Sequence, residues 1–243
     1  MRAILTYHSI DRSGSVISTA PEVFRAHVEW LATGAVQVVS LTEILSLADD
    51  RNAVALTFDD GFANVATDAA PLLAAHGFVA TVFVVSRHVG GDNRWNGAGD
   101  AGIPILPVLD WRGLEALRAR GFSVGAHTRN HRHLHHCAHD ELAEELGGSA
   151  DDIQRALGER PTTFAYPYGD VNTRVARAAA AAFATSCTTD FQELRRGVSR
   201  ERVPRLDAWY FRDPAMLRRW GTRRFRAAIR TRHALRRLRR VFR

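Results

Sequence analysis

The sequence predicts an α/β fold built from parallel strand–helix units, and three observations lead to this class. Short apolar runs alternate with helical patterns along the chain, which is typical of parallel βα units. Polar residues gather where several apolar runs end, as they do in folds whose sites lie at the carboxyl ends of parallel strands. Glycines follow four of the helical patterns, where a left-handed C-cap is favoured, at Gly34, Gly77, Gly121 and Gly158.

The individual elements follow in order along the chain. Strands are predicted over residues 3–9, 36–41, 54–59, 79–85, 122–127, 163–168 and 184–189. Helices are predicted over residues 21–31, 42–48, 63–76, 111–118, 140–157 and 173–182, with Pro21 in the first turn of the first helix. Residues 87–110 form a glycine-rich loop, and loops of that length are usually functional. The alternation alone fits a closed barrel and an open doubly wound sheet equally well.

Length and composition indicate an ordinary globular protein. The 243 residues include 46% hydrophobic residues, and a chain of this length buries enough surface for one large core. It suits one α/β barrel or two small domains. Cys137 and Cys187 are too few for a disulfide framework or a zinc ribbon. All 33 basic side chains are arginine, which excludes mechanisms that need a Schiff-base or phosphate-loop lysine.

The net charge of +7 is unevenly distributed. The segment from Arg218 to Arg243 holds twelve arginines and no carboxylate, which leaves 21 basic and 26 acidic side chains in the first 217 residues. We therefore expect an acidic globular domain over residues 1–213 and an arginine-rich tail over residues 214–243.

The tail has a helical pattern of apolar residues. They are Leu217, Trp220, Phe225, Ile229, Leu235, Leu238 and Phe242. A basic amphipathic helix of this kind is typical of a segment that lies on an anionic membrane surface, but a terminal helix packed on the domain has the same pattern. Nucleic acid ranks third as a partner, because the body is acidic and no nucleic-acid reader motif accompanies the tail.

Neither a signal peptide nor a membrane-spanning segment is expected. The apolar stretch after Arg2 is far shorter than a signal-peptide core, and no run approaches the roughly 20 apolar residues of a spanning helix. The expected location is the cytoplasm, with a peripheral position at the inner membrane face if the tail binds lipid.

Four clusters of polar residues follow predicted strands, so the topology brings them to one face. The clusters are Tyr7-His8, Asp59-Asp60, the stretch from His127 to His131, and Tyr166-Pro167-Tyr168. Asp59 and Asp60 can take different roles, one holding a metal while the other accepts a proton. His127 and His131 can converge on that metal, because two imidazoles and a carboxylate leave open positions for water, as in catalytic zinc sites.

Each cluster also has a purely structural interpretation. Asp-Asp-Gly is a common turn, His8 alone suits a core histidine, and Pro167 alone suits a turn. The other histidines of the stretch suit a solvated helix face or an adventitious metal binder; they are His133, His135, His136 and His139. The coincidence of four clusters at four strand ends favours a functional site.

Three segments carry a resemblance to a known family. They read Thr57-Phe58-Asp59-Asp60-Gly61, His127-Thr128-Arg129-Asn130-His131 followed by Leu134, and Phe164-Ala165-Tyr166-Pro167-Tyr168-Gly169. Over roughly residues 3–210 the chain resembles the polysaccharide deacetylases, the NodB-homology group or carbohydrate esterase family 4. Its early Tyr-His pair is similar to the exopolysaccharide deacetylase subgroup. The resemblance implies a distorted (β/α)7-type barrel and metal-dependent hydrolysis of N-acetyl groups on amino sugars.

The resemblance also implies a role for each motif position. Asp60, His127 and His131 become the ligands of a divalent metal, for which Zn²⁺ is favoured. Asp59 becomes the general base for attack by metal-bound water. The backbone N–H of Tyr168 would join the metal in stabilising the oxyanion.

Two positions depart from the family pattern. Many members have an arginine that steadies the base where Ala165 stands, and Arg205 is our candidate to replace it. The late Leu-x-His motif that supplies the general acid is absent, and in the Tyr-His subgroup the early histidine takes its place. We therefore expect His8 to protonate the departing amine.

The candidate substrate-binding residues are Trp95, Pro167, Tyr168 and Trp209. Trp95 lies on the long loop and Trp209 follows the predicted barrel strands, and either indole can stack on a sugar or pack in the core. The expected substrate is an N-acetylated polysaccharide or lipid-linked glycan. Two other functions fit the same fold, an amidohydrolase of a small non-sugar amide and a catalytically inactive glycan-binding module.

Overall fold

Eight parallel strands form the main sheet of the computed structural model, which describes residues 1–241. They are β1 (Arg2–Tyr7), β4 (Gln37–Val38), β5 (Ala53–Phe58), β6 (Thr81–Val84), β7 (Ser123–Ala126), β8 (Thr163–Ala165), β9 (Thr185–Cys187) and β10 (Leu206–Asp207). Their order is β10-β1-β5-β6-β7-β8-β9, with β4 paired to the beginning of β5. A separate parallel pair joins β2 (Ser9–Ile10) to β3 (Ser18–Thr19). The predicted α/β class is confirmed.

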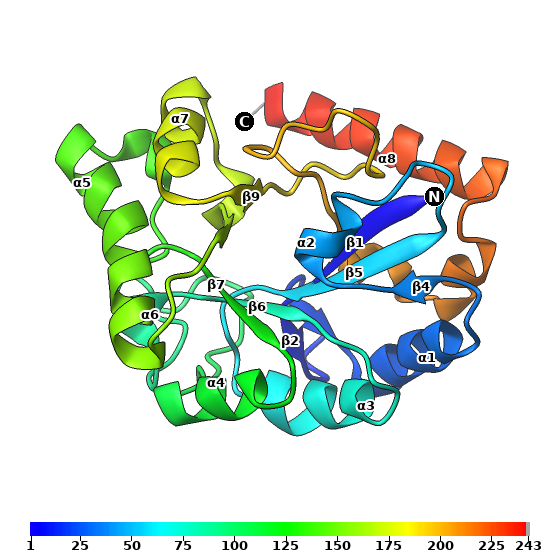
Figure 1. Ribbon diagram of the computed structural model, residues 1–243, viewed down its shortest axis with the longest axis horizontal. Helices are drawn as coiled ribbons and strands as arrows, with labels where there is room; N and C mark the ends of the chain where they lie inside the picture. The colour runs from blue at the N-terminus through cyan, green and yellow to red at the C-terminus, as the bar shows by residue number, and fades with distance from the viewer. Residues whose placement is uncertain (242–243) are drawn as a thin grey trace.

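The main sheet curls strongly, so the fold is of the barrel type and not an open doubly wound sheet (Figure 1). Cys187 of β9 pairs in parallel with Val203, and the Thr188 N–H donates to the Val203 carbonyl oxygen at 2.8 Å. The chain then enters β10, which pairs with β1. The barrel is distorted because an isolated bridge, and not a continuous ladder of hydrogen bonds, joins β9 to the segment before β10.

Helices surround the curled sheet (Figure 1). The α-helices are α1 (Pro21–Ala32), α2 (Leu41–Ile44), α3 (Ala70–Ala74), α4 (Trp111–Arg118), α5 (His139–Ala143), α6 (Ser149–Leu157), α7 (Thr173–Ala182) and α8 (Arg223–Val241). The π-helical turns η1 (Val65–Ala69) and η4 (Glu144–Gly148) lead into α3 and α6. Short 3-10 turns are η2 (Ser86–His88), η3 (Leu134–His136), η5 (Pro167–Gly169), η6 (Ala208–Phe211) and η7 (Pro214–Arg219).

The observed elements follow the predicted ones closely, and the differences have local causes. The four expected C-cap glycines all have positive φ, and α4 and α7 have the predicted bounds. The strand expected over residues 163–168 ends at Ala165, because Pro167 lacks a ladder N–H and Tyr168 has a φ of 60°. The strand β10 was not predicted, since two residues are too few to show a period.

Side-chain alternation along the strands divides the core into two regions. Leu5, Leu56 and Val82 belong to the large cluster between the sheet and the helices. Their neighbours Ile4, Ala55 and Phe83 belong to a smaller cluster, together with small residues such as Ala165 and Cys187. Because successive strand residues point to opposite faces, this smaller cluster lies inside the barrel. Small side chains there leave space for a large buried group.

The C-terminal helix α8 packs on the barrel with its first half. Phe225 and Ile229 are buried, and the Phe225 ring lies 5.7 Å from that of Phe211. Farther along, Leu235 and Leu238 are 53% and 58% exposed. The predicted apolar residue Phe242 lies outside the described residues. The beginning of α8 therefore packs on the barrel, as one of the two tail interpretations expects, whereas its later turns expose two apolar side chains.

Among residues 1–241, no helix has both the length and the apolar character that crossing a bilayer requires.

Candidate active site

Four predicted site residues lie just beyond the carboxyl ends of strands, at the same end of the barrel. His8 follows β1, Asp59 and Asp60 follow β5, and His127 follows β7. All three strands are parallel, so their carboxyl ends share one face. The structure brings these side chains together there, with His131 added from the loop after β7.

Asp60, His127 and His131 converge on one point. The Asp60 Oδ1 atom lies 3.3 Å from Nε2 of His127 and 3.3 Å from Nε2 of His131. All three residues are buried, and within the described residues this Oδ1 atom has no hydrogen-bond partner. A buried acceptor without a donor is costly, and a cation would satisfy it. The donor set of two imidazoles and one carboxylate therefore fits a divalent metal such as Zn²⁺.

Neighbouring groups orient the two imidazoles. The Nδ1 of His127 donates to the Ala165 carbonyl oxygen at 2.7 Å, which leaves the Nε2 lone pair directed to the Asp60 side. The Nδ1 of His131 lies 3.1 Å from the Tyr168 hydroxyl. Each ring is thus held through the nitrogen that does not face the carboxylate.

The backbone of the site is strained. The non-glycine residues with positive φ, among those described, are Asp60, Thr128, His131 and Tyr168. All four belong to the site loops, where such conformations are maintained by the surrounding structure. The Thr128 hydroxyl, for example, accepts the His131 N–H at 2.9 Å.

Asp59 has a different partner from Asp60. Arg205 donates to both of its carboxylate oxygens, at 2.7 Å and 2.8 Å. The guanidinium is 1% exposed and also donates to the Thr57 hydroxyl and the Thr188 carbonyl oxygen. It lies 5.5 Å from the centre of the Phe83 ring, which belongs with Ala165 to the cluster inside the barrel. The sequence candidate for the missing motif arginine thus lies against the candidate base.

The two carboxylates are electrostatically stabilised as anions. Burial raises the pKa of Asp59, but the Arg205 guanidinium and His127 lower it by more, so its pKa lies below the usual value. Burial also raises the pKa of Asp60, while contacts with His127 and His131 bring it well below the usual range. Both side chains are therefore ionised at neutral pH.

His8 borders the pair of Asp59 and Arg205. Its Nε2 lies 3.9 Å from Asp59 Oδ2, which is beyond hydrogen-bond distance, and its side chain is 23% exposed. The imidazole therefore lies between the buried Asp59 carboxylate and solvent.

The structure brings two of the four candidate substrate-binding side chains close to the candidate metal ligand His131. The rings of Trp95 and Tyr168 lie 4.9 Å and 4.6 Å from that of His131. Pro167 is buried beneath the turn before Tyr168. Trp209 is half-buried, and its ring contacts Tyr210 and Arg212.

Sequence reasoning missed the carboxylate that holds the histidine loop. Glu145 is 3% exposed and accepts the backbone N–H groups of Arg129 and Asn130, at 3.0 Å and 2.9 Å, as well as the Asn130 side chain. Arg129 in turn donates to Asp152 of α6. The only signal in the sequence was an acidic residue on an otherwise apolar face of the helix over 140–157.

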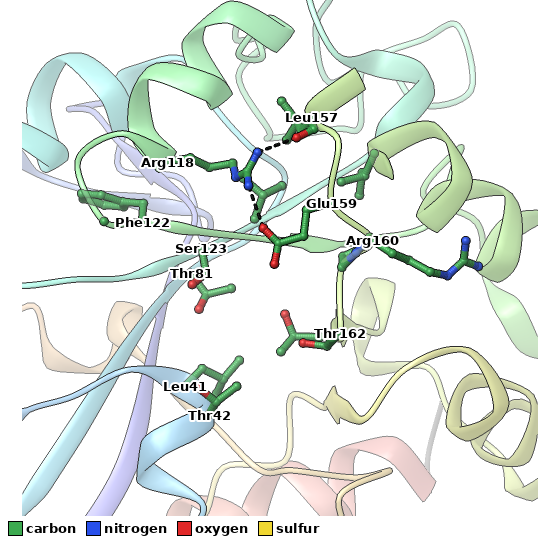
Figure 2. A pocket seen from close by; sticks show the side chains of 15 residues that line it. Leu41, Thr42, Thr81, Arg118, Phe122, Ser123, Leu157, Glu159, Arg160 and Thr162 are labelled. Carbon is green, nitrogen blue, oxygen red and sulfur yellow. Dashed lines mark hydrogen bonds and ion pairs between the residues drawn. The ribbon is translucent and has the colours of Figure 1, made fainter. Parts of the chain in front are cut away.

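A hydroxyl-rich cavity of about 310 Å³ lies at the opposite end of the barrel (Figure 2). Thr81, Ser123 and Thr163 line it, and each begins a strand. Arg118 closes one side with bonds to the Leu157 carbonyl oxygen and to Glu159, both 2.7 Å long. None of the predicted site residues lines this cavity.

Comparison with known proteins gives concordant matches. The family profile described as "Polysaccharide deacetylase" matches residues 47–185. YxkH of Bacillus subtilis strain 168, a protein assigned to the polysaccharide deacetylases, is 27% identical over 181 residues; the match covers 72% of this chain but 60% of that protein. Deacetylase PplD of Streptococcus pyogenes, solved with acetate, superposes with a TM-score of 0.72 at 21% identity over 84% of this chain and 91% of that one. IcaB of Ammonifex degensii gives 0.72 at 22% identity, over 88% and 95%.

Proposed function

Because the chain belongs to the polysaccharide deacetylase family, we propose that it removes N-acetyl groups from amino sugars of a glycan with the help of a divalent cation. The observation that carries this proposal is the different partnership of two adjacent carboxylates. Asp59 is bound by Arg205, whereas Asp60 faces His127 and His131. This difference supports the division of roles that we propose, in which Asp60 holds the cation and Asp59 accepts a proton.

Asp60, His127 and His131 would hold the cation. When bound there, it would polarise the amide carbonyl and make a water molecule more acidic. This donor set favours Zn²⁺, and other first-row divalent ions accept the same ligands.

We assign Asp59 the role of general base, which takes a proton from the attacking water. Its low pKa keeps it ionised, and the two bonds from Arg205 hold its oxygens in one orientation. Arg205 is 1% exposed, so it acts through Asp59 as a positioning residue. General base catalysis of this kind typically contributes a factor of about 10² to 10⁴ in rate.

We assign His8 the role of general acid. When the tetrahedral intermediate collapses, the C–N bond breaks and the departing amine takes up a proton. The imidazole of His8 is 3.9 Å from the base and partly exposed, so it can reach a substrate nitrogen from the side that borders solvent. Histidine suits this step because it titrates near neutrality.

The loop residues around His131 would bind the acetamide and its sugar. We assign the backbone N–H of Tyr168 to the oxyanion, since this residue follows Pro167 in a tight turn at the end of β8. The rings of Trp95 and Tyr168 flank His131 and offer apolar faces on which a sugar can stack. Pro167 and Trp209 remain proposed contacts for the rest of the glycan.

The arrangement also bears on the two alternative functions. A glycan-binding module that had lost catalysis would have no need for a buried arginine on Asp59, because that ion pair requires desolvating two charges. An amidohydrolase of a small amide would use the same Asp59 and Asp60, so this alternative differs only in substrate. The aromatic rings beside His131 favour a sugar.

The later turns of α8 suggest a cellular location for the reaction. Leu235 and Leu238 are exposed, and arginines surround them in the sequence. Such a surface suits an anionic lipid layer. We propose that the protein works at the inner face of the cytoplasmic membrane on a lipid-linked or nascent glycan.

Acetate release from a panel of N-acetylated glycans tests the proposal. The zinc-loaded protein should release acetate, and both chelation and Asp60→Ala should reduce the rate by at least about 10²-fold. His139→Ala is the matched control, because that side chain is 92% exposed and pairs with Asp140 outside the candidate active site. Zinc-independent release, or full activity in Asp60→Ala, would contradict the proposal. Release from small amides alone would favour the amidohydrolase.

A further inference from the structure

A second group of metal-ligating side chains lies next to the candidate active site. His133, His135 and Asp170 each place one donor atom within 4.8 Å of the others. The Nδ1 of His133 is 3.4 Å from Asp170 Oδ2, and the Nδ1 of His135 is in direct contact with the same oxygen. We propose that these three residues bind a second divalent cation of the Zn²⁺ type.

The chemistry of the donors selects the class of ion. Two imidazole nitrogens and one carboxylate oxygen suit Zn²⁺, Ni²⁺ or Cu²⁺, whereas Mg²⁺ and Ca²⁺ prefer all-oxygen sites. The set has the same composition as the first group, but it is more exposed. The side chains of His133 and His135 are 53% and 38% exposed, and that of Asp170 is 17% exposed. A solvated site of this kind is expected to bind more weakly than the buried one.

The backbone that carries the ligands is organised independently of any ion. Arg174 of α7 donates to the carbonyl oxygens of Leu134, His135 and Cys137, at 3.4, 3.2 and 2.9 Å. These bonds fix the 3-10 turn η3 on the beginning of α7. Preformed turns reduce the ordering that a cation would otherwise have to impose.

The position of this group connects it to the first one. The ring of His133 stacks on Tyr168 with the centroids 4.0 Å apart and the planes at 15°. The Tyr168 hydroxyl in turn lies 3.1 Å from His131 Nδ1. A cation on His133, His135 and Asp170 would therefore tie η3 to the turn that contains Tyr168. That consequence for catalysis rests on the proposed function, whereas the binding of the ion does not.

Zinc titration of the metal-free, full-length protein tests the proposal, with bound zinc measured by calorimetry and by elemental analysis after desalting. The wild type should bind two equivalents, the second with a Kd at least tenfold weaker than the first. The double substitution His133→Ala/His135→Ala should remove the weaker equivalent, and Asp60→Ala the tighter one. Excess zinc should raise the Tm of the wild type beyond its value at one equivalent, and this further rise should be absent from the double variant.

His136→Ala is the matched control, because this residue is adjacent to His135 but is not one of the three ligands. It should retain both equivalents. The proposal would be overturned if the wild type bound a single equivalent that Asp60→Ala removes, or if the folded double variant still bound two. If Asp60→Ala kept both equivalents while the double variant lost one, the first site and the proposed function would fail and the second site would stand.

Discussion

At the scale of single residues, the main feature of the site is that two adjacent aspartates have different surroundings. Asp59 and Asp60 are neighbours in sequence, yet the first faces a guanidinium and the second faces two imidazoles. The positive φ of Asp60 (68°) turns the chain sharply between them. The two carboxylates thereby have different partners, as the proposed division into a proton acceptor and a metal ligand requires.

Replacing Arg205 should change the pH dependence of catalysis. Burial raises the pKa of Asp59 and the Arg205 guanidinium is the main group that lowers it, so in Arg205→Met burial meets less opposition and the pKa of Asp59 rises. A general base is active when deprotonated, so the acid limb of the kcat/KM profile should move to higher pH. Metal content should stay unchanged, because the hydrogen bonds of Arg205 within the described residues go to Asp59, Thr57 and Thr188, and none of these is a candidate metal ligand.

Arg205→Lys serves as the conservative comparison, since it retains the charge but not the bidentate geometry. It should restore part of the shift in the acid limb. Removing one partner of a buried ion pair costs roughly 3–5 kcal/mol, so Tm is measured alongside. A purely structural arginine would lower Tm in both variants and leave the acid limb where it was.

At the scale of elements, the motifs were predictable because each lies at a strand end marked by an apolar run. Asp59, Asp60, His127 and His131 fall within two such segments, and local sequence identifies them. The pairing of Arg205 with Asp59 joins residues 146 positions apart and depends on the closure of the barrel after β9. The hydrophobic periodicity of the sequence does not indicate which distant segments pair to close the barrel. Arg205 was therefore only a candidate, whereas Glu145 was missed altogether.

A side chain at Gly169, in the turn after β8, should destabilise the protein. A Cβ there would lie 2.0 Å from the Thr189 hydroxyl oxygen, and the residue has a φ of 68°. Gly158, with a φ of 76°, has no atom within 4 Å of its Cβ position. Gly158→Ala should cost only the left-handed backbone penalty of about 1–2 kcal/mol. Gly169→Ala should cost about 1–3 kcal/mol more through overpacking.

Chemical denaturation of the two glycine variants measures both costs. Because Gly169 follows Tyr168, acetate release should also fall in Gly169→Ala under conditions where the variant remains folded. Equal unfolding free energies for the two variants would show that the turn accommodates a Cβ by moving Thr189.

At the scale of the whole molecule, the net charge of +7 comes from the segment over residues 218–243, which contains α8. The first half of this helix packs on the segment after β9, where Arg226 pairs with Glu193 at 2.8 Å. Arg236 donates to the Thr189 carbonyl oxygen at 3.1 Å, beside the carboxyl end of β9. The later turns of α8 therefore lie toward the barrel face that carries the site. A membrane bound by these turns would lie close to the candidate active site.

The exposed leucines of α8 should govern association with lipid. Leu235→Glu/Leu238→Glu should abolish co-sedimentation with vesicles rich in phosphatidylglycerol at low salt, because it removes apolar contact and adds negative charge. The wild type should bind these vesicles, bind phosphatidylcholine vesicles weakly, and dissociate as salt screens the arginines. Ile105→Glu, at a residue 55% exposed in the loop between η2 and α4, is the control. Equal co-sedimentation of the double variant would contradict the membrane role.

The most direct test of the account is Asp59→Asn, measured for both zinc content and acetate release. Asparagine keeps an acceptor for Arg205 but cannot take a proton from water. We predict that the variant retains the zinc equivalent held by Asp60, His127 and His131 while kcat falls by about 10² to 10⁴-fold. Near-normal kcat with the zinc in place would contradict the assignment of Asp59 as the base.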